Sequence, residues 1–176
     1  MHIMLGEFYE LDKKIIKLMA TYGLPALRIS MGVVFLWFGF LKFFPGVSPA
    51  EELAIHTTEI LSFGLLDDRT AVFVIALWES IIGIGLIFRL FMRFTILLLF
   101  LQMIGACAPL VIFPDQVFTQ FPYAPTLEGQ YIIKNIVIIC AALVLGASVR
   151  GGSVFPGFVQ KKLLKKADEK SQDGNS

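Results

Sequence analysis

Long apolar runs alternate with short polar segments along the chain of 176 residues. Four runs reach about 20 residues, the length that a helix needs to cross a hydrocarbon layer of roughly 30 Å. An apolar run of this length is typical of a membrane-spanning helix. The pattern therefore predicts four spans, at Leu24–Phe44, Thr70–Phe88, Phe94–Phe113 and Gln130–Ser148.

A shorter pattern precedes the first span. Residues 7–20 place Phe8, Leu11, Ile15 and Leu18 on one face of a helix, while the lysines of this segment lie elsewhere. An amphipathic helix with a basic polar side is typical of a segment that lies on the membrane surface. We therefore expect an N-terminal interfacial helix.

The segment after the first span carries the signals of a helix start. Ser48 fits an N-cap, Pro49 the first helical position, and Glu51 follows the cap by three residues. Residues 48–63 are therefore predicted to form a short outer helix. Residues 114–129 contain three prolines and are predicted to form an outer loop over the mouth of the bundle.

The composition supports a membrane protein. Hydrophobic residues make up 56% of the chain and charged residues 16%, whereas soluble domains carry about 25% charged residues. The net charge of +1 argues against nucleic acid as a partner. The expected fold is all-α, an integral membrane four-helix bundle forming one transmembrane domain over residues 1–150. Residues 151–176 are expected to be a basic cytoplasmic tail with a disordered end.

The cations are unevenly distributed between the two sides of the predicted bundle. The N-terminal part, the short segment between the second and third spans, and the C-terminal part together hold 12 of the 15 Lys and Arg residues. Because basic segments stay in the cytoplasm, both termini are predicted to be cytoplasmic. The expected location is a bacterial-type inner membrane, crossed several times.

The first span has a stripe of charged and small residues. Arg28, Gly32, Phe35, Gly39 and Lys42 are spaced by 4, 3, 4 and 3 residues and share one helical face. Glycines mark places where membrane helices approach closely, so this stripe is expected to face the other helices. The alternative is that Arg28 and Lys42 only anchor the two ends of the span at the membrane surfaces.

The second span places a carboxylate deep in the membrane. Ala76, Glu79 and Gly83 lie on one face, and Glu79 is about nine residues, roughly 14 Å, from the end of its span. A glutamate at that depth is neutral, paired or beside a water-filled cavity.

The last two spans also have polar stripes. Thr95, Gln102, Ala106 and Pro109 share a face of the third span. Lys134, Ala141 and Ser148 share a face of the fourth, with Asn135 beside it.

These stripes predict a buried charge site. Lys42 and Lys134 enter from the outer side and can bend toward Glu79. Two lysines and one glutamate leave one positive charge, which a bound anion, a neutral lysine or an electron-rich ligand such as a quinone carbonyl would balance. A helix-locking ion pair is the alternative. The candidate site residues are Lys42, Glu79, Gln102, Lys134 and Asn135, with Arg28 at the cytoplasmic end of the stripe.

Other site chemistry finds little support. The predicted spans contain no histidine, which excludes a bis-histidine haem within them. The sequence has no phosphate-binding loop and no clustered set of metal ligands, so no metal is assigned. A quinone is the one cofactor considered.

Several stretches carry a family resemblance. "LRISMGVVFLWFGFLKFFPG" resembles the first helix of the DoxX-like superfamily, especially its YkgB-like branch. "LWESIIGIGLIF", "CAPLVIFP" and "GQYIIKNIVIICAALVLGAS" resemble its second, third and fourth helices. The resemblance implies a four-helix inner-membrane protein and draws attention to Arg28, Lys42, Glu79 and Lys134. Some YkgB-like relatives have an acid where this chain has Asn135.

The resemblance also implies function classes. Some members of the superfamily are linked to quinone-dependent sulfur oxidation and others to resistance against oxidants. The leading hypothesis is a redox-linked accessory protein that interacts with a quinone, alone, as a homo-oligomer or with a membrane redox partner. The alternatives are a carrier or channel for a small solute or ion, and a structural partner in a membrane complex.

Overall fold

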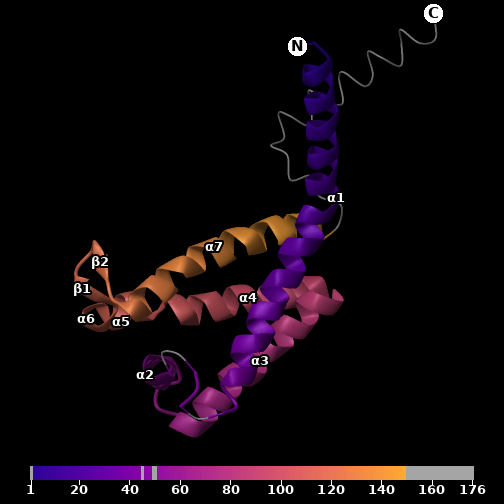
Figure 1. Ribbon diagram of the computed structural model, residues 1–176. Coiled ribbons are helices and arrows are strands. Elements are labelled where there is room, and N and C mark those ends of the chain that lie inside the picture. Colours follow the sequence, from indigo (N-terminus) through magenta and orange to yellow (C-terminus); the bar gives the residue numbers. More distant parts are fainter. Residues whose placement is uncertain (1, 45, 49–50, 150–176) are drawn as a thin grey trace, which may run out of the picture.

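The computed structural model describes residues 2–44, 46–48 and 51–149, with side chains from residue 9 onward, and it is mostly helical (Figure 1). Four helices are long and apolar enough to cross a membrane. They are formed by α1 (His2–Leu41), α3 (Asp68–Phe88), α4 (Met92–Cys107) continued by α5 (Pro109–Ile112), and α7 (Leu127–Ser148). The four predicted spans are confirmed as helices. The predicted basic tail, residues 151–176, lies outside the described residues.

The first helix differs from the prediction. An interfacial helix and a separate first span were expected, but α1 is one continuous helix of 40 residues. Pro25 lies inside it. Proline removes only one backbone hydrogen bond and can be accommodated in a long helix with a local kink. The sequence between residues 20 and 28 therefore contains no signal strong enough to end the helix.

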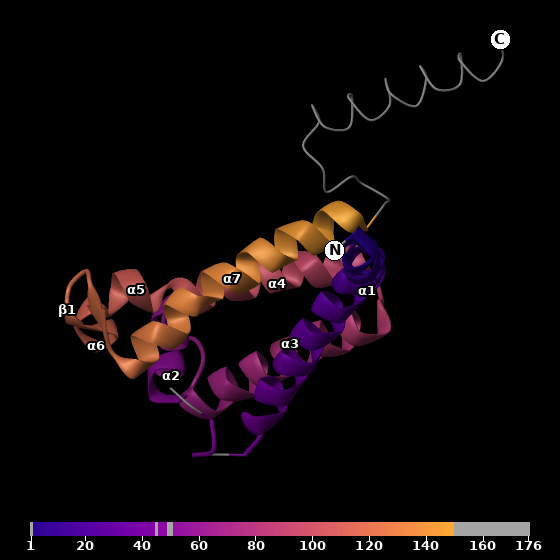
Figure 2. The same ribbon diagram turned by 45° about the horizontal axis from the view of Figure 1, so that its top comes forward.

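The four long helices form two antiparallel pairs. α1 packs along α3, and α4 packs along α7 (Figure 1). The pairs come together where α3 turns into α4 and diverge toward α2 (Glu51–Leu61) (Figure 2). We call these two regions the turn end and the cap end.

The core at the turn end is shared by all four long helices. Its buried side chains come from α1, α3, α4 and α7, and they are Met31, Phe35, Ile82, Leu86, Ile96, Leu99, Met103, Ala142 and Leu145. Apolar side chains are also abundant on the outer surfaces of these helices, including Trp37, Phe40 and Leu101. That surface fits contact with lipid, since apolar patches of this extent are rare on soluble proteins.

Glycines allow the backbones of α1 and α3 to approach closely. A Cβ atom placed on Gly83 would lie 2.5 Å from the backbone nitrogen of Leu36 and 2.8 Å from the carbonyl oxygen of Gly32. A Cβ atom on Gly39 would lie 2.9 Å from the Cβ of Glu79. The predicted inward orientation of the glycine stripe on the first span is therefore confirmed.

The cap end contains more structure than the sequence suggested. Residues 51–61 form α2, within the predicted helix, although Pro49 of the predicted start lies outside the described residues. The predicted loop includes α6 (Pro114–Val117) and a small antiparallel hairpin of β1 (Phe118–Gln120) and β2 (Ala124–Pro125). A second core cluster of Leu53, Val117 and Ile132 joins α2, α6 and α7.

The packed face of α7 also differs from the predicted stripe. Its buried residues are Gly129, Ile132, Ala142 and Leu145. Lys134, which the prediction placed on the inner stripe, is exposed. The reason is that small residues occur on more than one side of this helix, so their spacing alone did not identify the packed face.

Candidate functional site

A polar cluster joins α1, α3 and α4. The Nζ atom of Lys42, one residue beyond the end of α1, donates to Oε2 of Glu79 on α3 at 2.7 Å. The Nε2 atom of Gln102 on α4 donates to Oε1 of the same carboxylate at 3.0 Å. Each carboxylate oxygen of Glu79 therefore has a partner, and three of the five predicted site residues meet.

The local fold explains how these side chains reach one another. Gly39 lies one turn before Lys42 and packs directly against Glu79 and Ser80, which brings the end of α1 close to α3. The indole nitrogen of Trp78 donates to the carbonyl oxygen of Leu98 at 3.1 Å and holds α4 against α3. The sequence does not reveal the contact between Trp78 and Leu98, because a single tryptophan gives no sign of its hydrogen-bond partner.

The cluster is only partly buried, which corrects the expectation of a buried charge site. The side chains of Lys42 and Glu79 retain 14% and 13% of their accessible surface. Lys42 lies just beyond the last turn of α1, and the helix pairs diverge on this side of the core (Figure 2). The polar atoms consequently remain within reach of a small molecule or water.

Two of the predicted site residues lie apart from this cluster. Lys134 is exposed, and its Nζ atom lies 5.5 Å from the ring centroid of Tyr131, a cation–π contact. Asn135 is half-buried, and in the described part of the chain the partners of the Glu79 carboxylate are Lys42 and Gln102 instead. Among the residues that the structure describes, the ion pairs are Lys42–Glu79 and Lys13–Glu10, so the second lysine does not pair with Glu79.

Arg28 contacts the neighbouring helix, as the predicted inward stripe requires, and is not only an anchor at the membrane surface. Its Nη1 atom donates to the carbonyl oxygens of Leu86 and Ile87, the second at 2.8 Å. These carbonyls belong to the last turn of α3, where helix geometry leaves acceptors without partners. A cation at a helix C-terminus also interacts favourably with the helix dipole. Arg28 therefore caps α3 from the neighbouring helix, which a charge pattern alone cannot show.

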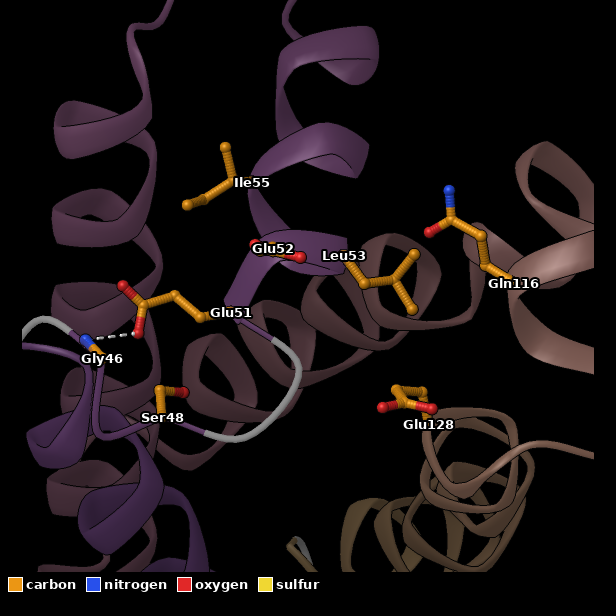
Figure 3. A pocket seen from close by; sticks show the side chains of 8 residues that line it. All are labelled: Gly46, Ser48, Glu51, Glu52, Leu53, Ile55, Gln116 and Glu128. Carbon is orange, nitrogen blue, oxygen red and sulfur yellow. Dashed lines mark hydrogen bonds between the residues drawn. The ribbon is translucent and has the colours of Figure 1, made fainter.

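A separate hollow of about 540 Å³ lies at the cap end (Figure 3). Glu51, Glu52 and Glu128 line it together with Gln116. One of the three carboxylates, Glu51, accepts a hydrogen bond from the backbone nitrogen of Gly46 at 3.0 Å. Within the described part of the chain, no three His, Cys, Asp or Glu residues are grouped as metal ligands would be.

Comparison with known families adds to this geometry. A family model described as DoxX matches residues 23–113, half of the chain. The chain belongs to the DoxX family. The matched segment begins just before Arg28 and contains Lys42, Glu79 and Gln102, so the polar cluster lies entirely within the DoxX region. Lys134, by contrast, lies beyond it.

Two further comparisons gave no match, neither among curated proteins nor among solved structures. DoxX family membership and the four candidate spans together identify a multi-pass membrane protein. The geometry of the cluster is then the basis for a functional proposal.

Proposed function

We propose that this DoxX protein is a redox-linked accessory protein that binds a quinone or a similar amphiphile at Lys42, Glu79 and Gln102. The observation that supports this proposal is the cluster itself: three polar side chains meet where the end of α1 lies beside α3 and α4, and the ion pair among them is mostly buried. Binding sites for small amphiphiles are typically apolar with a few converging polar groups.

The chemistry of the cluster suits a carbonyl or hydroxyl head group. Lys42 can donate to a ligand carbonyl oxygen, and Glu79 can accept a hydrogen bond from a ligand hydroxyl. The amide of Gln102 donates to Glu79 and so orients its carboxylate. Apolar ring and tail atoms would lie against the surrounding helices, where lipid also has access.

The proposal includes the arrangement in the membrane. We place the turn end and both termini on the cytoplasmic side, because Arg89 and Arg93 flank the turn and the positive-inside rule applies. The N-terminal part of α1 then lies at the inner surface and α2 at the outer side. We assign the chain to the YkgB-like branch on the motif at residues 27–46.

The test uses tryptophan fluorescence. The chain has two tryptophans, and Trp78 is adjacent to Glu79. In a Trp37→Phe background, a short-chain quinone should quench Trp78 saturably in detergent micelles. Losing a hydrogen bond to a charged group costs about 1.5–3 kcal/mol. Lys42→Met and Glu79→Gln should therefore each weaken binding about tenfold or more.

Lys134→Met is the matched control. It removes the same charge from an exposed lysine that contacts Tyr131, so quinone affinity should not change. Equal affinity for the parent, Lys42→Met and Glu79→Gln proteins would reject the proposed site.

One observation favours a structural role as the second candidate. Both oxygens of Glu79 already have protein partners, and its charge is balanced by Lys42. If the cluster only holds the helices together, the Lys42→Met and Glu79→Gln proteins should be less stable than the parent. The quinone should then give no saturable quenching, even with the parent protein.

A further inference from the structure

The N-terminal half of α1 extends beyond the other helices. Arg28 reaches the last carbonyls of α3, and Leu24 and Leu27 pack against the core at the turn end. These contacts place the turn end at the level of residues 24–28 of α1. From there toward the N-terminus, residues 9–23 are all exposed, and this part of α1 stands alone (Figure 1).

The projecting segment has an apolar stripe that contacts no other described element. Leu11, Ile15, Leu18 and Tyr22 are spaced by 4, 3 and 4 residues and therefore share one helical face. Their exposed fractions lie between 44% and 62%. Fourteen residues of helix, 9–22, are about 21 Å long, so a straight helix along the membrane normal would carry most of this stripe into water.

A bend is possible where this segment meets the core. Pro25 has no backbone N–H, so the carbonyl of Thr21 lacks its usual helical partner. Gly23, two residues earlier, would have no neighbouring atom within 4 Å even with an added Cβ. Residues 21–23 are exposed, so a change of direction on the N-terminal side of Leu24 would disturb no packing against the core.

The small net charge of residues 9–22 indicates that burial of apolar side chains, and not electrostatic attraction, would hold this segment at a membrane surface. Lys13 is already engaged, with its Nζ atom 3.0 Å from Glu10 and 4.3 Å from the ring centroid of Tyr9. The remaining charges of residues 9–22 are Lys14, Lys17 and Asp12. A surplus of one positive charge gives little electrostatic attraction, whereas the stripe offers four large apolar side chains to the boundary between head groups and acyl chains.

We infer that residues 9–22 dock on the lipid surface of the bilayer that the protein spans, through the Leu11–Ile15–Leu18–Tyr22 stripe, with a hinge at residues 21–25. The occupant is the adjacent leaflet, because this stripe continues the lipid-facing apolar surface of the same helix. Which leaflet this is rests on the proposed orientation. The same spacing would also suit pairing with a second copy, which is one outcome of the test.

The test is spin labelling of the full chain in a bilayer of phosphatidylcholine and phosphatidylglycerol. Cys107→Ser and Cys140→Ser give a background for single nitroxide labels at Leu18→Cys and at the matched neighbour Lys17→Cys. Docking predicts that the label at residue 18 collides mainly with oxygen, and the label at residue 17 mainly with a water-soluble nickel complex. High salt should leave this contrast unchanged, because apolar contacts dominate.

Three results would overturn the inference. Equal access of the nickel complex to both labels would mean that the helix stands in water. Dipolar broadening at residue 18 would mean that a second copy covers the stripe. Loss of the contrast in high salt would mean that charge holds the segment. The hinge predicts that Gly23→Ala combined with Pro25→Ala abolishes the contrast, and an unchanged contrast in that variant would reject the hinge.

The orientation is tested separately. A membrane-impermeant thiol reagent added to intact cells should not reach Lys17→Cys. Labelling from outside would contradict the proposed topology, while the contrast between residues 17 and 18 would still decide whether the segment lies on lipid.

Discussion

Glu79 shows what a carboxylate requires inside an apolar helix. It lies about 16 Å along α3 from Asp68 and about 14 Å from Phe88, so its short side chain reaches neither end. Removing an unpaired carboxylate from water costs several kcal/mol. Lys42 balances the charge, and Gln102 occupies the second oxygen. The acid, the cation and the amide therefore act as one unit.

The first prediction concerns this unit. Lys42→Met leaves the Glu79 carboxylate without its cation, whereas Lys42→Met combined with Glu79→Gln removes both charges. Breaking one side of a buried pair costs about 3–5 kcal/mol, and the partial exposure of this pair places it near the lower limit. The double variant should be more stable than Lys42→Met alone. The measurement is unfolding in mixed micelles of the parent protein, Lys42→Met, Glu79→Gln and the double variant.

Two control substitutions, each of which removes one cation, accompany this cycle. Lys134→Met and Arg28→Met should each add independently to Glu79→Gln, because neither residue contacts the cluster. Additive effects of Lys42→Met and Glu79→Gln would show that the interaction between Lys42 and Glu79 does not contribute to stability.

A second prediction concerns Asp67, which precedes the membrane-spanning part of α3. The hydroxyl and the backbone nitrogen of Thr70 donate to the carboxylate, and these hydrogen bonds hold the pKa of Asp67 below its ordinary value. A lowered folded-state pKa gives stability that is present above the unfolded-state pKa and is lost as the pH falls through the folded-state pKa.

The measurement is the midpoint of unfolding in detergent as the pH falls below about 4, the ordinary range of an aspartate. The stability difference between the parent protein and Asp67→Asn should shrink across this window. A difference that is constant with pH would mean that the cap bonds do not depend on the charge of Asp67.

At the scale of elements, α1 and α3 are held together by close backbone approach. Gly32 and Gly83 face each other across the seam, and Gly39 lies against Glu79. This close packing fixes the position of Lys42 along α3 relative to Glu79. The contact between α1 and α3 therefore also determines the geometry of the polar cluster.

The third prediction tests the seam with a matched pair of glycines. Gly83→Ala places a methyl group 2.5 Å from the backbone of Leu36, which cannot move aside cheaply, and should destabilise the protein by about 1–3 kcal/mol. Gly105→Ala on α4 meets only the tip of Leu61 at 4.0 Å and should be neutral or stabilising by up to about 1 kcal/mol. Equal effects of the two changes on unfolding in micelles would contradict close packing at Gly83.

The elements differ in how well the sequence predicted them. The spans and the inward glycine stripe follow from length and periodicity, which are local properties. These stripes also placed Lys42, Glu79 and Gln102 on inward faces, but only the structure shows that the three side chains meet. The position of Lys134 does not, because several sides of α7 carry small residues. The hairpin at residues 118–125 depends on contacts with α6 and α7, which a local pattern does not contain. The partner of Arg28 is a backbone carbonyl, which leaves no trace in the sequence.

At the scale of the molecule, two helix pairs meet in one core at the turn end and separate toward the cap end (Figure 2). The polar cluster lies on the cap side of that core, since Glu79 precedes Ile82 and Leu86 along α3. An amphiphile would therefore approach the cluster from the half of the bilayer that contains the cap.

The fourth prediction concerns topology. Because basic residues flank the spans on one side, reporter fusions at Arg89 and at Asn175 should report a cytoplasmic location, and a fusion at Pro122 an external one. Fusions of an alkaline phosphatase and of a fluorescent protein at each position give opposite signals. A cytoplasmic signal at Pro122 would contradict the proposed orientation.

The two hydrophobic cores have a consequence for how the protein opens. Nine buried side chains form the cluster at the turn end and three form the cluster at the cap end, with none in common. Regions with fewer buried contacts open at lower free energy than the whole molecule unfolds. The cap end is therefore expected to open locally at lower free energy than the turn end, which keeps the four helices assembled. Such opening would enlarge the access to Glu79 that its partial exposure already gives.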